Sequence, residues 1–139
     1  MPLPDAEIER LLERWPVARL ATIHADGRPH LVPIVFARSG GALWSPIDGK
    51  PKSAARLARI RNVERDPRVA LLLDHYDADW KQLWWVRLDG RATLVPGDDA
   101  AEAALRAKYP QYRGVPLYAA EPLLIRIEPT QVTTWGRAE

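Results

Sequence analysis

The sequence predicts a mainly β domain of the α+β type, an antiparallel barrel with peripheral helices. Segments rich in β-branched and apolar residues outnumber those with helical spacing, and the turn signal Asp26-Gly27 separates the first two of them. Strands joined by short hairpins pair antiparallel, whereas a doubly wound parallel sheet alternates strand with helix along the chain. The length of 139 residues fits one domain, which we expect to span residues 1–139.

The first element is predicted to be a helix that begins at Pro4 and Asp5 and ends at Pro16. One face of this segment is charged, which is typical of a helix surface in contact with water. The other face is apolar at helical spacing and consists of Ile8, Leu11, Leu12 and Trp15.

Three strands are expected next. Residues 17–23 and 30–36 predict the first two, and Pro33 places the second at an edge or a bulge, because proline has no N–H to donate. A glycine pair then predicts a further turn, and Ala42–Pro46 a short third strand.

The middle of the chain is predicted to form a loop, a helix and a strand. Residues 48–52 predict the loop, and Ser53 is placed to cap a helix that runs to about Asn62. Residues 69–73 are continuously apolar, which predicts a strand buried on both faces.

A long strand and a helix follow. Residues 83–95 predict the strand, with Gly90 at a bulge or turn. Asp99 and Glu102 resemble a capping box, which predicts a helix that ends near Lys108.

Two closing strands are predicted over residues 123–127 and 131–135, on either side of Pro129. The expected order is therefore helix, three strands, helix, two strands, helix, two strands.

Composition excludes several classes of protein. There are no cysteines, which excludes disulfides, zinc–thiolate sites and thiol catalysis and suits a reducing cytoplasm. The apolar runs are too short to cross a membrane, and residues 1–14 do not resemble a signal peptide. A net charge of only +2 argues against a dedicated nucleic-acid binder.

Familiar catalytic and metal motifs are missing from the sequence. The glycines never form GxGxxG, and Gly49-Lys50 is no P-loop, because Pro51 stands where Ser or Thr is required. The three histidines are scattered along the chain, so we expect no metal site. They are His24, His30 and His75.

A basic segment is the first candidate site. Lys50 and Lys52 precede a predicted helix N-terminus, where unpaired N–H groups and the Ser53 hydroxyl would favour a phosphate. A solvated helix face explains the same charges equally well, and a nucleic-acid patch less well, because no aromatic residues interleave with the bases. The seven bases are Lys50, Lys52, Arg56, Arg59, Arg61, Arg65 and Arg68.

Tryptophans form the second candidate. Trp44, Trp84 and Trp85 lie on or beside predicted strands and offer flat surfaces for a cofactor ring, although core packing is the commoner role. Trp84 and Trp85 are adjacent, so they must point to opposite faces of their strand.

Taken together, these motifs resemble the pyridoxamine 5′-phosphate oxidase-like superfamily of split β-barrels. Within it the chain most resembles a small actinobacterial branch of coenzyme F420-dependent oxidoreductases, on residues 74–80, 83–87 and 108–112. The oxidases proper carry an Arg-Lys pair where this chain has Pro51-Lys52, so the resemblance does not extend to oxidation of pyridoxamine phosphate. The segments that carry the superfamily resemblance are Leu20-Ala21-Thr22, Asp26-Gly27, Pro29-His30, and residues 32–36, 48–52, 62–72 and 89–92.

The resemblance implies a homodimer of antiparallel split β-barrels of the FMN-binding type, with cofactor sites at the subunit interface. Lys52 matches the phosphate-binding lysine of the family, and Lys50 lies beside it. The other cofactor-binding residues that the resemblance implies are Val32, Pro33, Ile34, Val35, Trp44, Ser45 and Trp85.

The expected function is hydride transfer between the deazaflavin coenzyme F420 and an unidentified small-molecule substrate. His30 and Tyr76 are weak candidates for a proton donor, and no residue is assigned a catalytic role. One alternative is an FMN-dependent oxidoreductase of the same fold. Another is a non-catalytic flavin- or haem-binding protein, in which His24, His30 or His75 would be the haem ligand.

Overall fold

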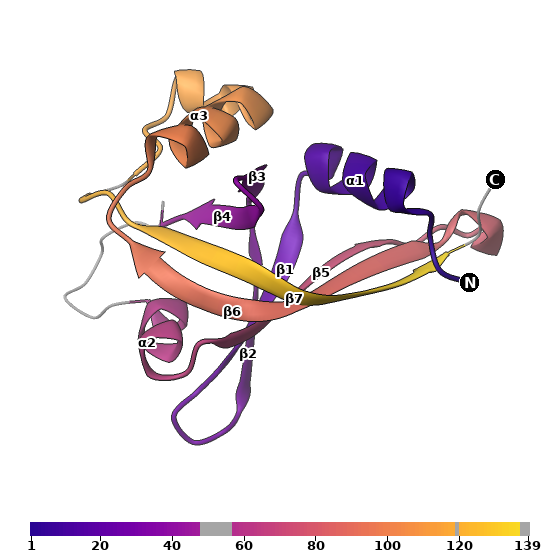
Figure 1. Ribbon diagram of the computed structural model, residues 1–139, viewed down its shortest axis with the longest axis horizontal. Helices are drawn as coiled ribbons and strands as arrows, with labels where there is room; N and C mark the ends of the chain where they lie inside the picture. Colours follow the sequence, from indigo (N-terminus) through magenta and orange to yellow (C-terminus); the bar gives the residue numbers. More distant parts are fainter. Residues whose placement is uncertain (48–56, 119, 137–139) are drawn as a thin grey trace.

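The computed structural model describes residues 1–47, 57–118 and 120–136. Within these residues the strands form one antiparallel sheet of seven, in the order β2-β1-β5-β6-β7-β4-β3 (Figure 1). The mainly β split-barrel fold class is therefore confirmed. The strands are β1 (Ala18–Ile23), β2 (Pro29–Ile34), β3 (Ala37–Ser39), β4 (Ala42–Pro46), β5 (Arg68–His75), β6 (Trp84–Val95) and β7 (Leu124–Gly136).

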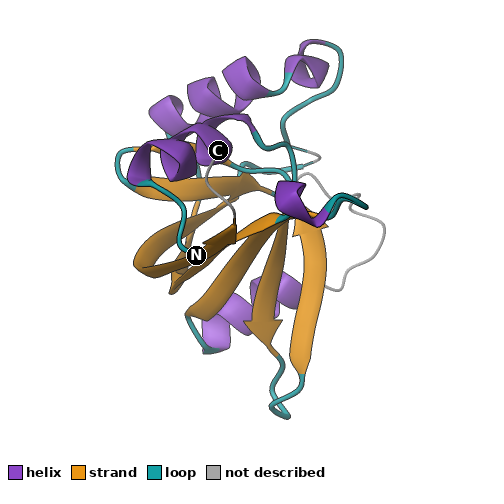
Figure 2. Cartoon of the chain, turned by 90° about the vertical axis from the view of Figure 1, so that its right-hand side faces the viewer, coloured by secondary structure: helices purple, strands orange, loops and turns teal. Residues whose placement is uncertain are grey.

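Helices cover both sides of the curved sheet. Figure 2 shows helices on both sides of the sheet. They are α1 (Asp5–Arg14), α3 (Asp99–Lys108) and the shorter α2 (Ala58–Arg65). Single turns of 3₁₀ helix, η1 (Trp80–Gln82) and η2 (Pro110–Arg113), connect other elements. None of the helices in the described ranges is long and apolar enough to cross a membrane.

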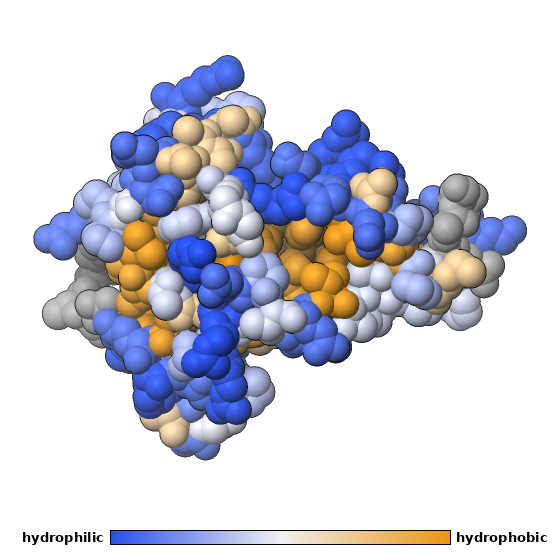
Figure 3. Space-filling view, viewed as in Figure 1, coloured by the Kyte–Doolittle hydropathy of each residue, from blue (hydrophilic) through white to orange (hydrophobic). Residues whose placement is uncertain are grey.

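The apolar face of α1 packs onto the main core. Leu11 and Leu12 are buried in the same core cluster as Leu20 and Leu71 of the sheet and Phe36 between β2 and β3, all three fully buried. This burial explains why the helical spacing of the first segment was a reliable signal. A groove of about 550 Å³ runs between α1 and the β3–β4 hairpin, and the apolar patch beside α1 is visible in Figure 3.

The hairpins follow the predicted turns. Gly27 has a φ of 87° between β1 and β2, and Gly40 and Gly41 have φ values of 60° and 79° between β3 and β4. Backbones of this kind favour glycine. Among the residues that the structure describes, β2 pairs only with β1, so the prediction that Pro33 marks an edge strand is confirmed. The short strand β3 was not predicted.

The middle of the chain departs from prediction at two points. The helix begins at Ala58, after Leu57, and continues to Arg65, so the predicted start at Ser53 was wrong; Ser53 itself lies outside the described residues. β5 is buried on one face only, because its alternate residues reach the outer surface of the antiparallel sheet. A continuous apolar run concealed that alternation.

The cap of α3 was assigned one residue too late. Asp98, and not Asp99, accepts a hydrogen bond from the Ala101 backbone N–H at 2.9 Å. Glu102 is therefore too far along the helix to close a capping box, and its carboxylate accepts a hydrogen bond from Tyr118 at 2.8 Å. The neighbouring aspartates made the sequence signal ambiguous.

The two predicted closing strands are one strand, β7. Pro129 does not interrupt it, because the register with β6 shifts between Asp89 and Gly90, opposite the proline. The irregularity predicted at Gly90 is thereby confirmed, with the extra residue, Thr130, on the facing strand β7. A Cβ at Gly90 would lie 2.5 Å from the backbone oxygen of Glu128, so the close approach of β6 to β7 at this position requires glycine.

Candidate functional site

Four of the predicted cofactor residues meet at one cavity of about 230 Å³. They are Pro33, Ile34, Val35 and Ser45, from the edge strand β2, the residue that follows it, and the buried strand β4. Pro46, the last residue of β4, Pro16 and Val17 between α1 and β1, and Arg59 of α2 complete the wall. The result is a mostly apolar hollow with one cationic side chain at its wall.

The remaining predicted residues lie elsewhere. Val32 packs against the main core. Trp44 is buried beneath α3, and its indole N–H donates to the Ser39 carbonyl at 2.9 Å. Trp85 lies on the outer surface of the sheet. Lys50 and Lys52 lie outside the described residues, so their phosphate role stays a prediction.

A buried tyrosine holds two segments of this wall together. The Tyr109 hydroxyl accepts a hydrogen bond from the Phe36 backbone N–H at 3.0 Å and lies 2.8 Å from the Pro16 carbonyl, to which it donates. Pro16 lines the cavity, and Phe36 follows Val35, which also lines it. Burial raises the pKa of Tyr109, so it stays a neutral donor at ordinary pH.

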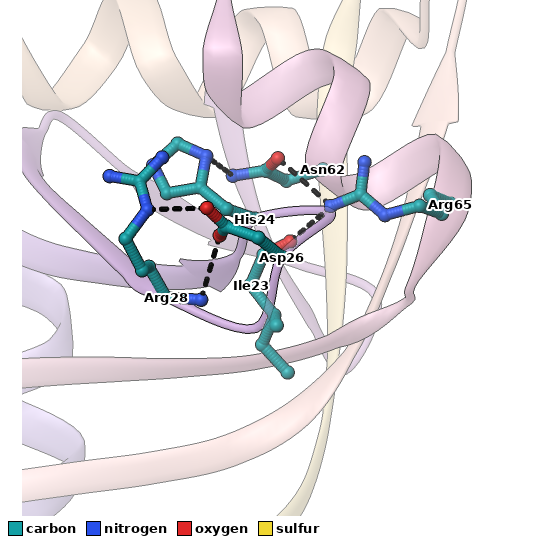
Figure 4. A network of polar contacts seen from close by, with 6 residues as sticks. All are labelled: Ile23, His24, Asp26, Arg28, Asn62 and Arg65. Atoms are coloured by element: carbon teal, nitrogen blue, oxygen red, sulfur yellow. Dashed lines mark hydrogen bonds and ion pairs between the residues drawn. The ribbon is translucent and has the colours of Figure 1, made fainter.

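A network of polar contacts fixes α2, and with it Arg59, against the β1–β2 hairpin (Figure 4). The buried Asn62 amide donates to the Thr22 hydroxyl at 2.9 Å and lies 3.5 Å from Nδ1 of His24. Arg65 donates to the Ile23 carbonyl at 2.5 Å and to the Asn62 side-chain oxygen at 3.2 Å. In the segment 62–72, which carries part of the family resemblance, Asn62 and Arg65 therefore hold α2 in place.

The rest of that motif shapes the turn after α2. Asp66 accepts hydrogen bonds from both the backbone and the guanidinium of Arg68, which lower the pKa of Asp66 to about 2. The Pro67 carbonyl accepts from the Ala92 backbone N–H at 2.8 Å, which joins the turn to β6.

The two histidines of the β1–β2 hairpin, His24 and His30, lie in contact with each other. The His24 and His30 rings lie 5.0 Å apart in an edge-to-face arrangement. Partial burial lowers the pKa of His30, and the charges of His24 and Arg59 lower it further. His30 is therefore held neutral near pH 7. Across the described ranges, no three His, Cys, Asp or Glu side chains gather as a metal site.

Trp84 and Trp85 point to opposite faces of β6, as predicted. Trp84 packs against Trp15 on the α1 side, with ring centroids 4.7 Å apart. Trp85 lies on the outer face in a shallow apolar surface of β2, β1, β5 and β6, which we call the outer patch. The outer patch is lined by Arg19, Ala21, Leu31, Ala70, Leu71, Leu72, Asp74, Trp85 and Arg87.

Sequence reasoning missed half of the cavity wall. In the sequence, Pro16 and Val17 were interpreted only as the end of the first helix and the start of the first strand. Pro46 was interpreted only as the end of the third predicted strand. Arg59 was counted among the bases, but no sequence signal separated it from its neighbours. Its position two residues into α2, a helix that begins later than expected, places it at the wall.

Comparison with known proteins gives the family. Residues 4–136 match the family model described as pyridoxamine 5′-phosphate oxidase. A 5a,11a-dehydrotetracycline/5a,11a-dehydrooxytetracycline reductase of Streptomyces rimosus is 30% identical over 98% of this chain and 84% of its own length.

Solved structures share the fold. A conserved hypothetical protein of Mycobacterium tuberculosis superposes with a TM-score of 0.75 at 26% identity, over 96% of this chain and 85% of that one. A structure described as an F420 reductase superposes with a TM-score of 0.65 at 26% identity, over 90% of this chain and 94% of that one.

Proposed function

Since the chain belongs to the pyridoxamine 5′-phosphate oxidase family of oxidoreductases, we propose that it uses reduced coenzyme F420 to reduce a small organic acceptor. One observation carries the proposal. Four of the residues that the resemblance places near the cofactor ring or its side chain line a single cavity beside the cationic Arg59; they are Pro33, Ile34, Val35 and Ser45.

The cavity wall fits one side of a flat, negatively charged cofactor. Pro33, Ile34 and Val35 offer an apolar surface from which water is excluded on binding. Arg59 supplies a positive charge to an anionic group. Pro46 lines the cavity and Lys50 follows it by four residues in the sequence, so Lys50 and Lys52 are the proposed partners of the phosphate.

The cofactor and the protein would have separate roles in the reaction. A reduced deazaflavin supplies the hydride when it is bound, and the chain's residues orient it and exclude water. Tyr109 keeps Pro16 and Phe36 at fixed separation, and Asn62 keeps α2 and Arg59 in place. Such support holds the first layer of contacts in a productive geometry.

The relatives favour the deazaflavin and an organic acceptor. The F420 reductase is one of the solved structures above 25% identity, and the Streptomyces rimosus relative is named as a reductase of dehydrotetracyclines. By analogy, the acceptor of this chain is a small unsaturated organic molecule.

A second copy of the chain would complete the site. The cavity of about 230 Å³ is smaller than the roughly 300–1,000 Å³ of typical small-molecule sites. The outer patch exposes Leu31 (65% exposed) beside Ala70, Leu72 and Trp85, and an apolar surface of this kind favours association. The proposed assembly is a homodimer with the cofactor between its subunits.

The test is a parallel titration of the purified protein with coenzyme F420 and FMN, followed by ligand fluorescence. Tighter binding of F420 supports the proposal, and preference for FMN assigns the protein to the FMN-dependent oxidoreductases. Binding of neither contradicts an enzyme with a cofactor in this cavity.

Variants locate the bound cofactor. Lys52→Ala and Arg59→Gln should each weaken binding more than about tenfold, because a hydrogen bond to a charged group contributes about 1.5–3 kcal/mol. Arg113→Gln, in η2 and away from the cavity, is the matched control and should leave affinity unchanged. Equal affinity of Arg59→Gln and the unmodified protein removes the described cavity from the site.

A further inference from the structure

Another hollow lies on the α1 side of the sheet, lined by none of the residues of the cofactor cavity. It measures about 490 Å³, within the range of roughly 300–1,000 Å³ that small-molecule sites occupy. The N-terminal segment, α1, the end of β5 and the start of β6 surround it. We call it the aromatic pocket; it is lined by Leu3, Pro4, Glu7, Arg10, Trp15, His75, Lys81, Gln82, Leu83 and Trp84.

Three rings form one wall of this pocket. Trp15 packs edge-on against Trp84 at 4.7 Å and against His75 at 5.9 Å between ring centroids. His75 and Trp84 are nearly parallel, at 28° and 6.3 Å. Flat side chains that hold one another in place present a rigid surface, and flat ligands pack on such a surface with little loss of side-chain freedom.

Polar groups at the pocket favour an anion. Glu7 and Arg10 form an ion pair with each other, so their charges largely cancel. Lys81 is exposed at the rim and has no ion-pair partner among the described residues. The indole N–H of Trp15 is a buried donor without an acceptor in the described part of the chain. This nitrogen is itself buried, so the preference for an anion rests on the charge of Lys81.

The pocket is built before any ligand arrives. The Leu3 backbone N–H donates to the Thr134 hydroxyl at 2.9 Å, and the Gly136 N–H donates to the Met1 carbonyl at 2.9 Å. A Cβ at Gly136 would lie 2.8 Å from Leu3 and 3.0 Å from Trp84, so the N-terminal segment packs closely on the end of β7. The pocket rim is therefore tied to the sheet.

The pocket also stays open in the proposed dimer. Trp84 faces the pocket, whereas Trp85 faces the outer patch on the other side of β6. A partner that covered the outer patch would leave the pocket accessible to small molecules.

We propose that the aromatic pocket is a second ligand site, for a planar aromatic molecule that carries a carboxylate or similar anion. The rings of Trp15, Trp84 and His75 contact its flat body, and Lys81 pairs with its charge. The site is separate from the cofactor cavity, so it does not depend on the identity of the cofactor.

The test is an NMR titration of the cofactor-free protein with 2-naphthoate, read on the indole N–H signals of the six tryptophans. Single Trp→Phe variants assign the signals. The expected result is a saturable shift of the Trp15 and Trp84 signals at the lowest ligand concentrations. Shifts confined to other tryptophans, such as Trp85 in the outer patch, or shifts that never saturate, overturn the proposal.

Charge recognition is tested on the same signals. Lys81→Gln should weaken 2-naphthoate binding about two- to fivefold, the range for an exposed ion pair, while Lys81→Arg should retain it. Arg113→Gln is the control and should bind as the unmodified protein does. Lys81 is exposed, so its replacement leaves the fold intact. Equal binding by Lys81→Gln, or equal affinity for the neutral naphthalene-2-carboxamide, overturns the proposal.

Discussion

At the scale of the residue, a single hydroxyl joins three segments of the chain. Replacing Tyr109 by Phe removes this hydroxyl and leaves the Phe36 N–H and the Pro16 carbonyl without their partner. We expect the free energy of unfolding to fall by about 1–3 kcal/mol, measured by urea denaturation. Tyr76→Phe, at a tyrosine that is 73% exposed, is the control and should be near neutral. Equal stability of both variants would contradict the role given to Tyr109.

Lys108 is a residue whose charge opposes folding. Burial lowers its pKa to about 8, Glu13 raises it and Arg38 lowers it again. Its ammonium lies 3.6 Å from the Phe36 ring centroid and donates to the Leu12 carbonyl at 3.2 Å. The unfolded chain binds more protons at this lysine than the folded chain does, so stability should rise with pH through this group.

The window follows from these pKa values. The burial penalty on Lys108 is complete below pH 8 and should disappear between about pH 8 and the ordinary lysine value of 10.5. Lys108→Met keeps the apolar stem and removes the charge. The unfolding free energy of the unmodified protein, measured by denaturation, should therefore rise relative to that of the variant as the pH increases across this window. A constant difference would show that Lys108 is solvated in the folded protein.

At the scale of the element, the β6–β7 pair depends on one position without a side chain. Gly90→Ala would press a methyl group against the Glu128 backbone oxygen, which cannot move without breaking the ladder. We expect a loss of about 1–3 kcal/mol in unfolding free energy, the usual cost of overpacking. Gly114→Ala has open space at its Cβ and should change stability by less than about 0.5 kcal/mol. Comparable effects of the two changes would contradict the close approach at the bulge.

At the scale of the whole molecule, the proposed dimer forms through the outer patch. Leu31→Glu introduces a charge at an exposed site, so it should leave the fold intact and shift the protein to a monomer by light scattering. Val115→Glu, at an apolar residue that is 56% exposed outside the patch, should retain the dimer. A dimer in both variants would place the interface elsewhere, and a monomeric unmodified protein would contradict the proposed assembly.

The same three scales show what a sequence can predict. Local signals succeeded where the chemistry is local: the apolar face of α1, the glycine turns and the opposite directions of Trp84 and Trp85. They failed where tertiary pairing decides. Pro129 was taken as a break, but the shift of register at Gly90 on the facing strand absorbs it.

The candidate site shows the same division. The resemblance predicted Pro33, Ile34, Val35 and Ser45; the first three are consecutive, and Ser45 lies near them only because β4 approaches the end of β2 in space. Pro16 and Arg59 join them through the α1–β1 connection and α2. No spacing in the sequence predicts that Pro16 and Arg59 lie at the same cavity, so they could be identified only from the structure.

The edge strand β2 bears on how the protein behaves at high concentration. Pro29 and Pro33 are an even number of positions apart, so their nitrogens point to the same side of the strand. In sheets, proline is tolerated where its nitrogen faces away from the neighbouring strand, which here is the open edge. That edge therefore offers few donors to an incoming strand, and edge-to-edge aggregation is disfavoured even though Leu31 is exposed nearby.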